Sequence, residues 1–123
     1  MRSNNTFYSL ETIPAGVELV HVETVVSGGM YRFDIIGTTQ KLASDTKHKV
    51  YTSLRASGLL NLKSDNRKIT TCLRSNTEGG QCVKPQLCEL AVALSCTYCI
   101  HNNKNEDTIL ALGELSITGA VIP

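Results

Sequence analysis

The chain has 123 residues, of which 41% are hydrophobic and 19% charged, and its formal net charge is +1. This length fits one domain, residues 1–123, and the composition is typical of a globular protein with a buried core. A charge near zero excludes a global attraction to nucleic acid or to an acidic membrane. The lack of tryptophan, with only 5% aromatic residues, argues against a stacking platform for single-stranded nucleic acid, which needs exposed rings.

The first half of the chain predicts two strands followed by a helix. Apolar and polar residues alternate over residues 17–26, and residues 30–36 are again strand-like after two glycines, so we expect an antiparallel hairpin. Apolar residues recur at helical intervals over residues 40–57. Either of the two preceding threonines can cap this helix, and Gly58 suits the position that ends it.

The second half predicts a strand over residues 67–73, a polar loop over residues 74–84 and a helix over residues 86–100 with Pro85 in its first turn. Because that helix is apolar on most of its surface, we expect it to be buried against the sheet and the other helix. Strands from residue 108 onward complete the order β-β-α-β-α-β-β, with a tight turn at Thr118-Gly119 before the last strand. This order predicts an α+β domain, a mixed β-sheet with two α-helices packed on one face.

Three blocks of sequence carry a resemblance to a known family. Residues 113–123, Gly-Glu-Leu-Ser-Ile-Thr-Gly-Ala-Val-Ile-Pro, resemble the Gly-Glu-Leu-Ser-Leu-x-Gly-x-(Val/Leu)-x-Pro signature of Lon-like domains. Residues 33–37, Phe-Asp-Ile-Ile-Gly, lead into a helix whose end is similar to Val-x-x-Ala-Leu-x-x-Ser-Gly, and residues 78–85 are similar to Glu-Gly-Gly-x-x-Asp-Leu-Pro. In this order and spacing, the blocks resemble the amino-terminal Lon-like domain of the ComM/magnesium-chelatase-like AAA+ ATPase family over residues 5–123.

The resemblance implies a ribosomal protein S5 domain 2-like fold and a non-catalytic role. In this family such a domain supports assembly of the ATPase ring, and DNA handling in transformation and recombination is a further expectation. Its partners would be the AAA+ module of the same protein, neighbouring subunits and, weakly and without sequence preference, DNA. The chain has no G-x-x-x-x-G-K-[ST] motif, so no cofactor is expected in it, and ATP and magnesium are expected only in a following AAA+ module.

A peptidase activity is expected to be absent. The serine of the Lon-type dyad corresponds to Gln81, whose amide cannot attack a carbonyl, and the dyad lysine would follow Pro123. The sequence also departs from the family pattern at Val83 and Lys84, where the family has Asp-Leu. Two alternatives stay open: a degenerate Lon-like peptidase using Cys82, and a stand-alone protein-interaction module.

The amino-terminal residues predict the compartment. Residues 1–6 are polar and lead into no apolar stretch, so no signal peptide is expected and a cytoplasmic protein without membrane contact is predicted.

The five cysteines are expected to be packed in the core rather than to take part in redox or metal chemistry. Their odd number, in a chain without a secretory signal, argues against a disulfide framework. Cys88, Cys96 and Cys99 fall on one helical face and should be buried. A metal site on Cys96, Cys99 and His101 is the alternative, although no second C-x-x-C is present.

Basic residues cluster mildly between residues 41 and 74. The candidate DNA contacts are Lys41, Lys47, Lys49, Arg55, Arg67, Lys68 and Arg74. A solvated helix face is the alternative interpretation of the same residues. If both lysines touch phosphates, replacing Lys47 and Lys49 by alanine should flatten the salt dependence of duplex binding by up to about two units of log affinity against log salt.

Overall fold

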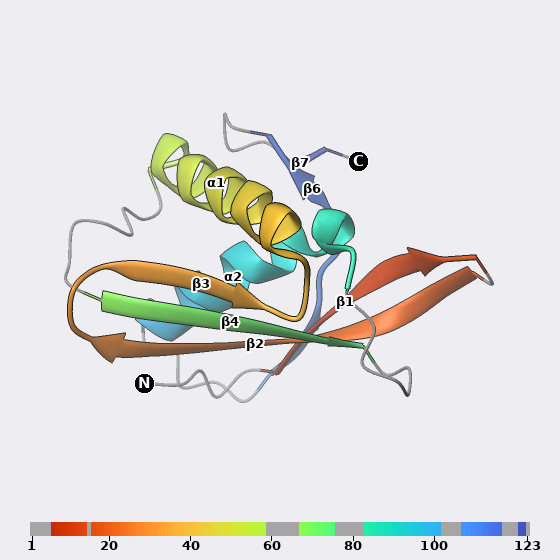
Figure 1. Ribbon diagram of the computed structural model, residues 1–123, viewed down its shortest axis with the longest axis horizontal. Coiled ribbons are helices and arrows are strands. Elements are labelled where there is room, and N and C mark those ends of the chain that lie inside the picture. Colours follow the sequence, from red (N-terminus) through yellow and green to blue (C-terminus); the bar gives the residue numbers. More distant parts are fainter. Residues whose placement is uncertain are drawn as a thin grey trace.

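The computed structural model describes residues 6–14, 16–58, 67–75, 83–101, 107–116 and 121–122. Figure 1 shows one mixed sheet with two helices on the same side of it. The α+β class with two helices packed on one face of a mixed sheet is therefore confirmed. Within the described residues, no helix is long and apolar enough to span a bilayer.

The main sheet has five strands in the order β3-β4-β2-β1-β5. Their bounds are β1 Thr6–Ile13, β2 Gly16–Gly28, β3 Arg32–Ile36, β4 Arg67–Ser75 and β5 Thr108–Leu110. β2 runs antiparallel to both β1 and β4, whereas β3 is parallel to β4 and β5 is parallel to β1. β4, β2 and β1 thus each have a neighbouring strand on both sides, and β3 and β5 form the two edges.

The predicted hairpin between residues 17–26 and residues 30–36 is wrong. β4 lies between β2 and β3, with Val26 opposite Ile69 and Phe33 opposite Ile69 on the other side. The helix between β3 and β4 carries the chain back so that these strands lie parallel, and β4 then completes nine residue pairs with β2. The free edge of β2 is filled by β1, a strand that the sequence analysis did not predict.

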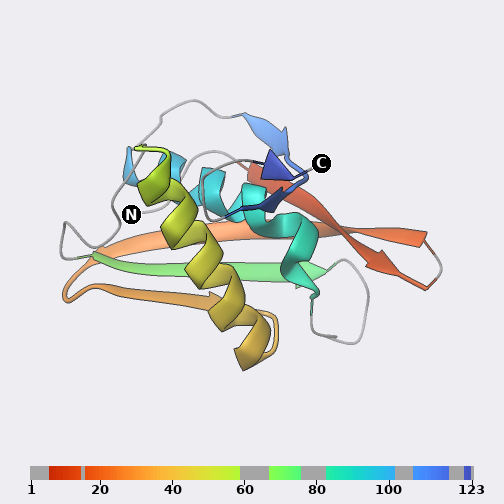
Figure 2. The same ribbon diagram turned by 90° about the horizontal axis from the view of Figure 1, so that it is seen from above.

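Two helices cover the sheet. α1 spans Gln40–Ala56, and α2 spans Glu89–Ile100 after a 3₁₀ turn, η1, at Pro85–Cys88. The predicted caps are confirmed: Thr39 Oγ1 accepts the Leu42 amide at 3.3 Å, and Gly58 follows the helix with φ +74°. Figure 2, seen from above, shows α1 crossing the β3 side of the sheet while α2 lies beside it over β2.

Gly37 fixes the connection from β3 to α1. Its φ is +103°, and a Cβ at this position would lie 2.0 Å from the Leu73 carbonyl oxygen. Its own carbonyl accepts the Val83 amide at 2.8 Å, which brings the start of η1 to the same corner. Only glycine fits this conformation and this contact.

The core lies between the helices and the buried face of the sheet. Phe7 packs edge-to-face on Tyr98 with ring centroids 5.3 Å apart. The predicted burial of the three helical cysteines is confirmed, because Cys88, Cys96 and Cys99 are all fully buried. A chain of buried polar groups also joins α2 to the sheet, since Ser95 Oγ donates to Thr24 Oγ1 at 2.7 Å.

The carboxyl-terminal strands form a separate pair. β6, Glu114–Leu115, is antiparallel to β7, Val121–Ile122, which confirms the two strands expected there. The turn predicted at Thr118-Gly119 lies outside the described residues. Figure 1 places this pair beside α1 and η1, away from the main sheet.

Candidate functional site

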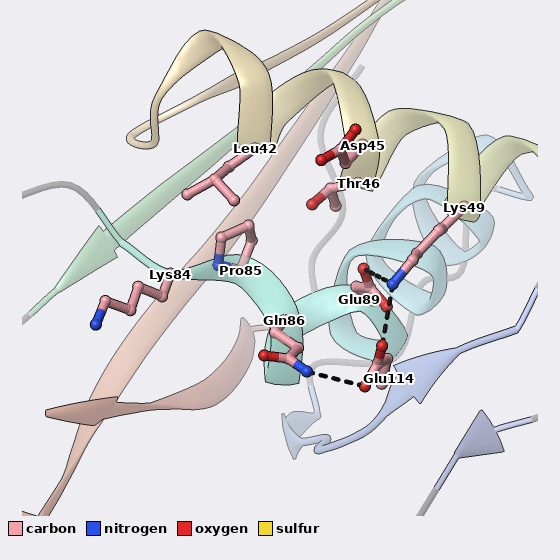
Figure 3. A pocket seen from close by; sticks show the side chains of 9 residues that line it. All are labelled: Leu42, Asp45, Thr46, Lys49, Lys84, Pro85, Gln86, Glu89 and Glu114. Atoms are coloured by element: carbon pink, nitrogen blue, oxygen red, sulfur yellow. Dashed lines mark hydrogen bonds and ion pairs between the residues drawn. The ribbon is translucent and has the colours of Figure 1, made fainter.

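The larger of two described cavities opens between α1, η1 and β6. Its volume is about 380 Å³. Figure 3 shows the nine lining residues, Leu42, Asp45, Thr46, Lys49, Lys84, Pro85, Gln86, Glu89 and Glu114. The four from α1 occupy positions i, i+3, i+4 and i+7 and therefore share one side of the helix.

Three of the charged side chains that line this cavity lie in contact with one another. Lys49 Nζ lies 3.3 Å from Glu89 Oε2 and 3.1 Å from Glu114 Oε1. Glu114 Oε2 accepts a second hydrogen bond, from Gln86 Nε2 at 3.1 Å, and the Leu115 amide donates to Glu89 Oε1 at 2.9 Å. Figure 3 shows the lysine reaching down from α1 between the two carboxylates. This cluster, Lys49, Glu89, Glu114 and Gln86, is called the charged cluster below.

Burial and pairing shift the two carboxyl groups in opposite directions. The loss of hydration at the buried Glu89 raises its pKa, although the Leu115 amide and Lys49 act against this change. Hydrogen bonds from Gln86 and Lys49 lower the pKa of Glu114. The pKa of Lys49 is raised, chiefly by its hydrogen bond to Glu114, so the ammonium is held in its charged form.

The charged cluster is built to fasten elements together. Its members come from α1, η1, α2 and β6, and every carboxylate oxygen of Glu89 and Glu114 has a donor. The backbone reinforces the same junction, because the Gly113 amide donates to the Leu87 carbonyl and the Leu90 amide donates to the Gly113 carbonyl, each at 3.1 Å. The arrangement therefore offers charge pairing among four elements of the fold.

The candidate DNA contacts are divided between two faces of the molecule. Lys68 and Arg74 alternate along β4 with the buried Ile69 and Leu73, so they lie on the face of the sheet that the helices leave uncovered. There Arg74 Nη2 lies 3.8 Å from Glu23 Oε2. Lys41, Lys47, Lys49 and Arg55 are on α1, and Arg67 begins β4. The seven residues therefore do not form one continuous patch.

Lys49 differs from the other helical cations. Its ammonium is paired with two carboxylates of the charged cluster, whereas Lys41 and Arg55 are exposed. The sequence analysis missed both carboxylates. A signal was present for Glu89, the one acidic residue in the otherwise apolar stretch of residues 86–100. Such an isolated charge in a buried helix needs a partner.

The residues of the alternative chemistries are not brought together. Cys96 is fully buried, and loss of hydration raises the pKa of its thiol to about 12. Cys99 is also buried, its thiol donating to the Thr24 carbonyl, whereas His101 is exposed at the end of α2. Among the residues that the structure describes, no group of three histidine, cysteine or acidic side chains is placed to hold a metal ion. Gln81 and Cys82 lie outside those residues.

The chain matches no protein-family model and no curated protein sequence.

Proposed function

We propose that this chain is the amino-terminal, non-catalytic domain of a ComM/magnesium-chelatase-like AAA+ ATPase, with the ribosomal protein S5 domain 2-like form of the α+β fold. Its role is to support assembly of the ATPase ring. The three sequence blocks motivate the family, and the order of strands and helices is compatible with the fold.

One observation carries the proposed role. The Gly-Glu-Leu residues of the signature, Gly113, Glu114 and Leu115, each bond to η1, α2 or α1 through backbone or side chain. The signature therefore fastens the final strand pair to the helical layer. A rigid attachment at this point would hold the domain in a fixed orientation to the ATPase module, as a ring of identical subunits requires.

A sequencing experiment and an assembly experiment test the proposal. The reading frame is expected to continue beyond Pro123 into a Walker A motif, and a stop codon without one would remove the AAA+ placement. In the complete protein, Glu114→Gln should weaken nucleotide-dependent ring formation, measured by analytical ultracentrifugation. Glu23→Gln makes the same change of charge on the uncovered face of the sheet and should leave the rings intact. Equal assembly of both variants would contradict the proposed role of the signature.

A further inference from the structure

A second cavity lies on the opposite side of α1, between this helix and the start of β3. Its volume is about 350 Å³, and it is shallow and open. Its lining residues are Tyr31, Phe33, Lys47, His48 and Tyr51. Three of these five residues are aromatic, although the chain has only six phenylalanines and tyrosines in total. This cavity is called the aromatic pocket below.

The three aromatic side chains of the pocket differ in burial. Phe33 is buried, and Tyr31 and Tyr51 are half-buried, so part of each tyrosine lies open to solvent. Loss of hydration raises the pKa of Tyr31, and the nearby Tyr51 adds to this effect, so the Tyr31 hydroxyl is neutral at physiological pH. Neutral aromatic rings anchored at one side and open at the other are suited to stacking against a planar ligand.

The pocket has a cationic side chain and no acidic one. Lys47 lines it together with the imidazole of His48, and no carboxylate does, whereas the cavity on the other side of α1 has three. Arg55 follows Tyr51 by one helical turn and continues the basic character along the same side. A ligand of this pocket should therefore combine a flat ring with a negative charge.

We propose that the aromatic pocket binds one base and an adjacent phosphate of single-stranded DNA. The base stacks against Tyr51 and Tyr31, as an unpaired base can, and Lys47 and His48 contact the phosphate. A base inside a duplex cannot reach such a pocket, so binding selects single strands. The inference develops the DNA contact that the resemblance implies for this domain, and it is independent of the proposed role in an ATPase ring.

Fluorescence anisotropy with a labelled oligothymidylate of about ten nucleotides tests the stacking contact. Tyr51→Leu removes the ring and should weaken binding by about five- to hundredfold. Tyr51→Phe keeps the ring and should bind like the unchanged protein. Equal affinity of all three proteins would overturn the proposal. Circular dichroism establishes whether each variant is folded. If Tyr51→Leu does not fold, His48→Ala tests the pocket instead, because His48 is exposed and its removal should also weaken DNA binding.

The salt dependence tests the phosphate contact and the choice of surface. Lys47→Gln should reduce the slope of log affinity against log salt by about 0.7 for a single strand. Lys84→Gln makes the same change at an exposed lysine of the other cavity, outside the candidate DNA contacts, and should leave the slope unaltered. If Lys68→Gln and Arg74→Gln weaken binding and the pocket variants do not, DNA binds the uncovered sheet face and the pocket proposal fails while the broader DNA contact stands. Absence of any binding removes both.

Two competing ligands show whether the pocket binds single-stranded DNA, a free nucleotide or duplex DNA. Thymidine monophosphate has the same base and phosphate as one unit of the oligonucleotide. Because neighbouring phosphates of the oligonucleotide add contacts, the mononucleotide should compete only at nucleotide concentrations at least about tenfold higher. Equal competition would identify a free nucleotide as the ligand instead. A duplex of the same length should compete more weakly than the single strand, and stronger competition would overturn the selection of unpaired bases.

Discussion

The two sides of α1 each carry a lysine, but the two lysines have different surroundings. On the side facing α2 and β6, the Lys49 ammonium lies within 3.3 Å of two carboxylates. On the side facing β3, Lys47 lies among aromatic residues, and no ion pair joins it to any residue that the structure describes. Two lysines only two positions apart in sequence therefore differ in what they can offer a ligand. The difference arises from which elements each side of the helix faces, and helical spacing alone does not reveal it.

The largest expected effect comes from a substitution at Gly37, because this residue connects β3 to α1 and the contacts on both sides of the helix depend on that connection. Gly37→Ala places a methyl group against the Leu73 carbonyl and forces alanine into a positive φ. It should lower the free energy of unfolding by at least about 3 kcal/mol, measured by urea denaturation. Gly28→Ala is the matched control, because a Cβ there meets nothing within 4 Å and its φ is not positive. Similar losses for both variants would show that strain at Gly37 is not the cause.

Removing the buried carboxylate of Glu89 should disrupt only the contacts on the side of α1 that faces α2. Glu89→Ala leaves the Leu115 amide without its acceptor and removes one partner of Lys49. We expect a loss of about 3 kcal/mol in the free energy of unfolding. His48→Ala on the other side should cost less than about 0.5 kcal/mol, because His48 is exposed. A comparable loss in both variants would remove the energetic contrast between the two sides.

The local features of this fold were predictable from the sequence. The cap at Thr39, the helix end at Gly58 and the buried cysteines of α2 each follow from residue type and helical spacing, and the structure confirms them. The two caps depend on interactions within a few residues of the chain, for which the sequence pattern is a sufficient guide. The burial of the cysteines depends on packing against the sheet, and the almost continuously apolar sequence of this helix is its signal.

The long-range features were not predictable in the same way. β1 was missed because Ser9 and Glu11 are polar residues on its buried face, so the usual apolar alternation is absent. Ser9 Oγ donates to the Leu87 carbonyl, and Glu11 accepts the Lys84 amide, and neither partner is near in sequence. The position of β4 between β2 and β3 and the ion pairs of Lys49 likewise depend on residues far apart in the chain. Of the candidate site, helical spacing placed Lys47 and Lys49 on α1, but only the tertiary structure shows their different surroundings.

A smaller effect distinguishes the two carboxylates of the charged cluster by their pH dependence. The pKa of Glu114 is lowered in the folded state, so its contribution to stability is present above the ordinary value of 4.5 and is lost as the pH falls through the folded pKa. The pKa of Glu89 is raised, so its contribution is present below 4.5 and is lost as the pH rises through the folded pKa.

Urea denaturation between about pH 3 and pH 7 measures both effects. The stability of the unchanged protein relative to Glu114→Gln should increase with pH, and its stability relative to Glu89→Gln should decrease with pH. Parallel curves for the two variants would mean that burial does not dominate at Glu89.

The smallest expected effect refines the comparison between Lys47 and Lys49 in duplex binding. The sequence predicts that replacing both lysines flattens the salt dependence by up to about two units. Because the Lys49 ammonium is paired with Glu89 and Glu114, we expect Lys47→Gln alone to reduce the slope by about 0.9 and Lys49→Gln to leave it unaltered. Lys49→Gln should instead lower the free energy of unfolding, since it leaves Glu89 buried without its cation. Duplex titrations at several salt concentrations, with urea denaturation of the same proteins, separate the two roles. An equal reduction in slope for both variants would mean that the Lys49 ammonium leaves its carboxylates to contact phosphate, and the two sides of α1 would then be alike toward DNA.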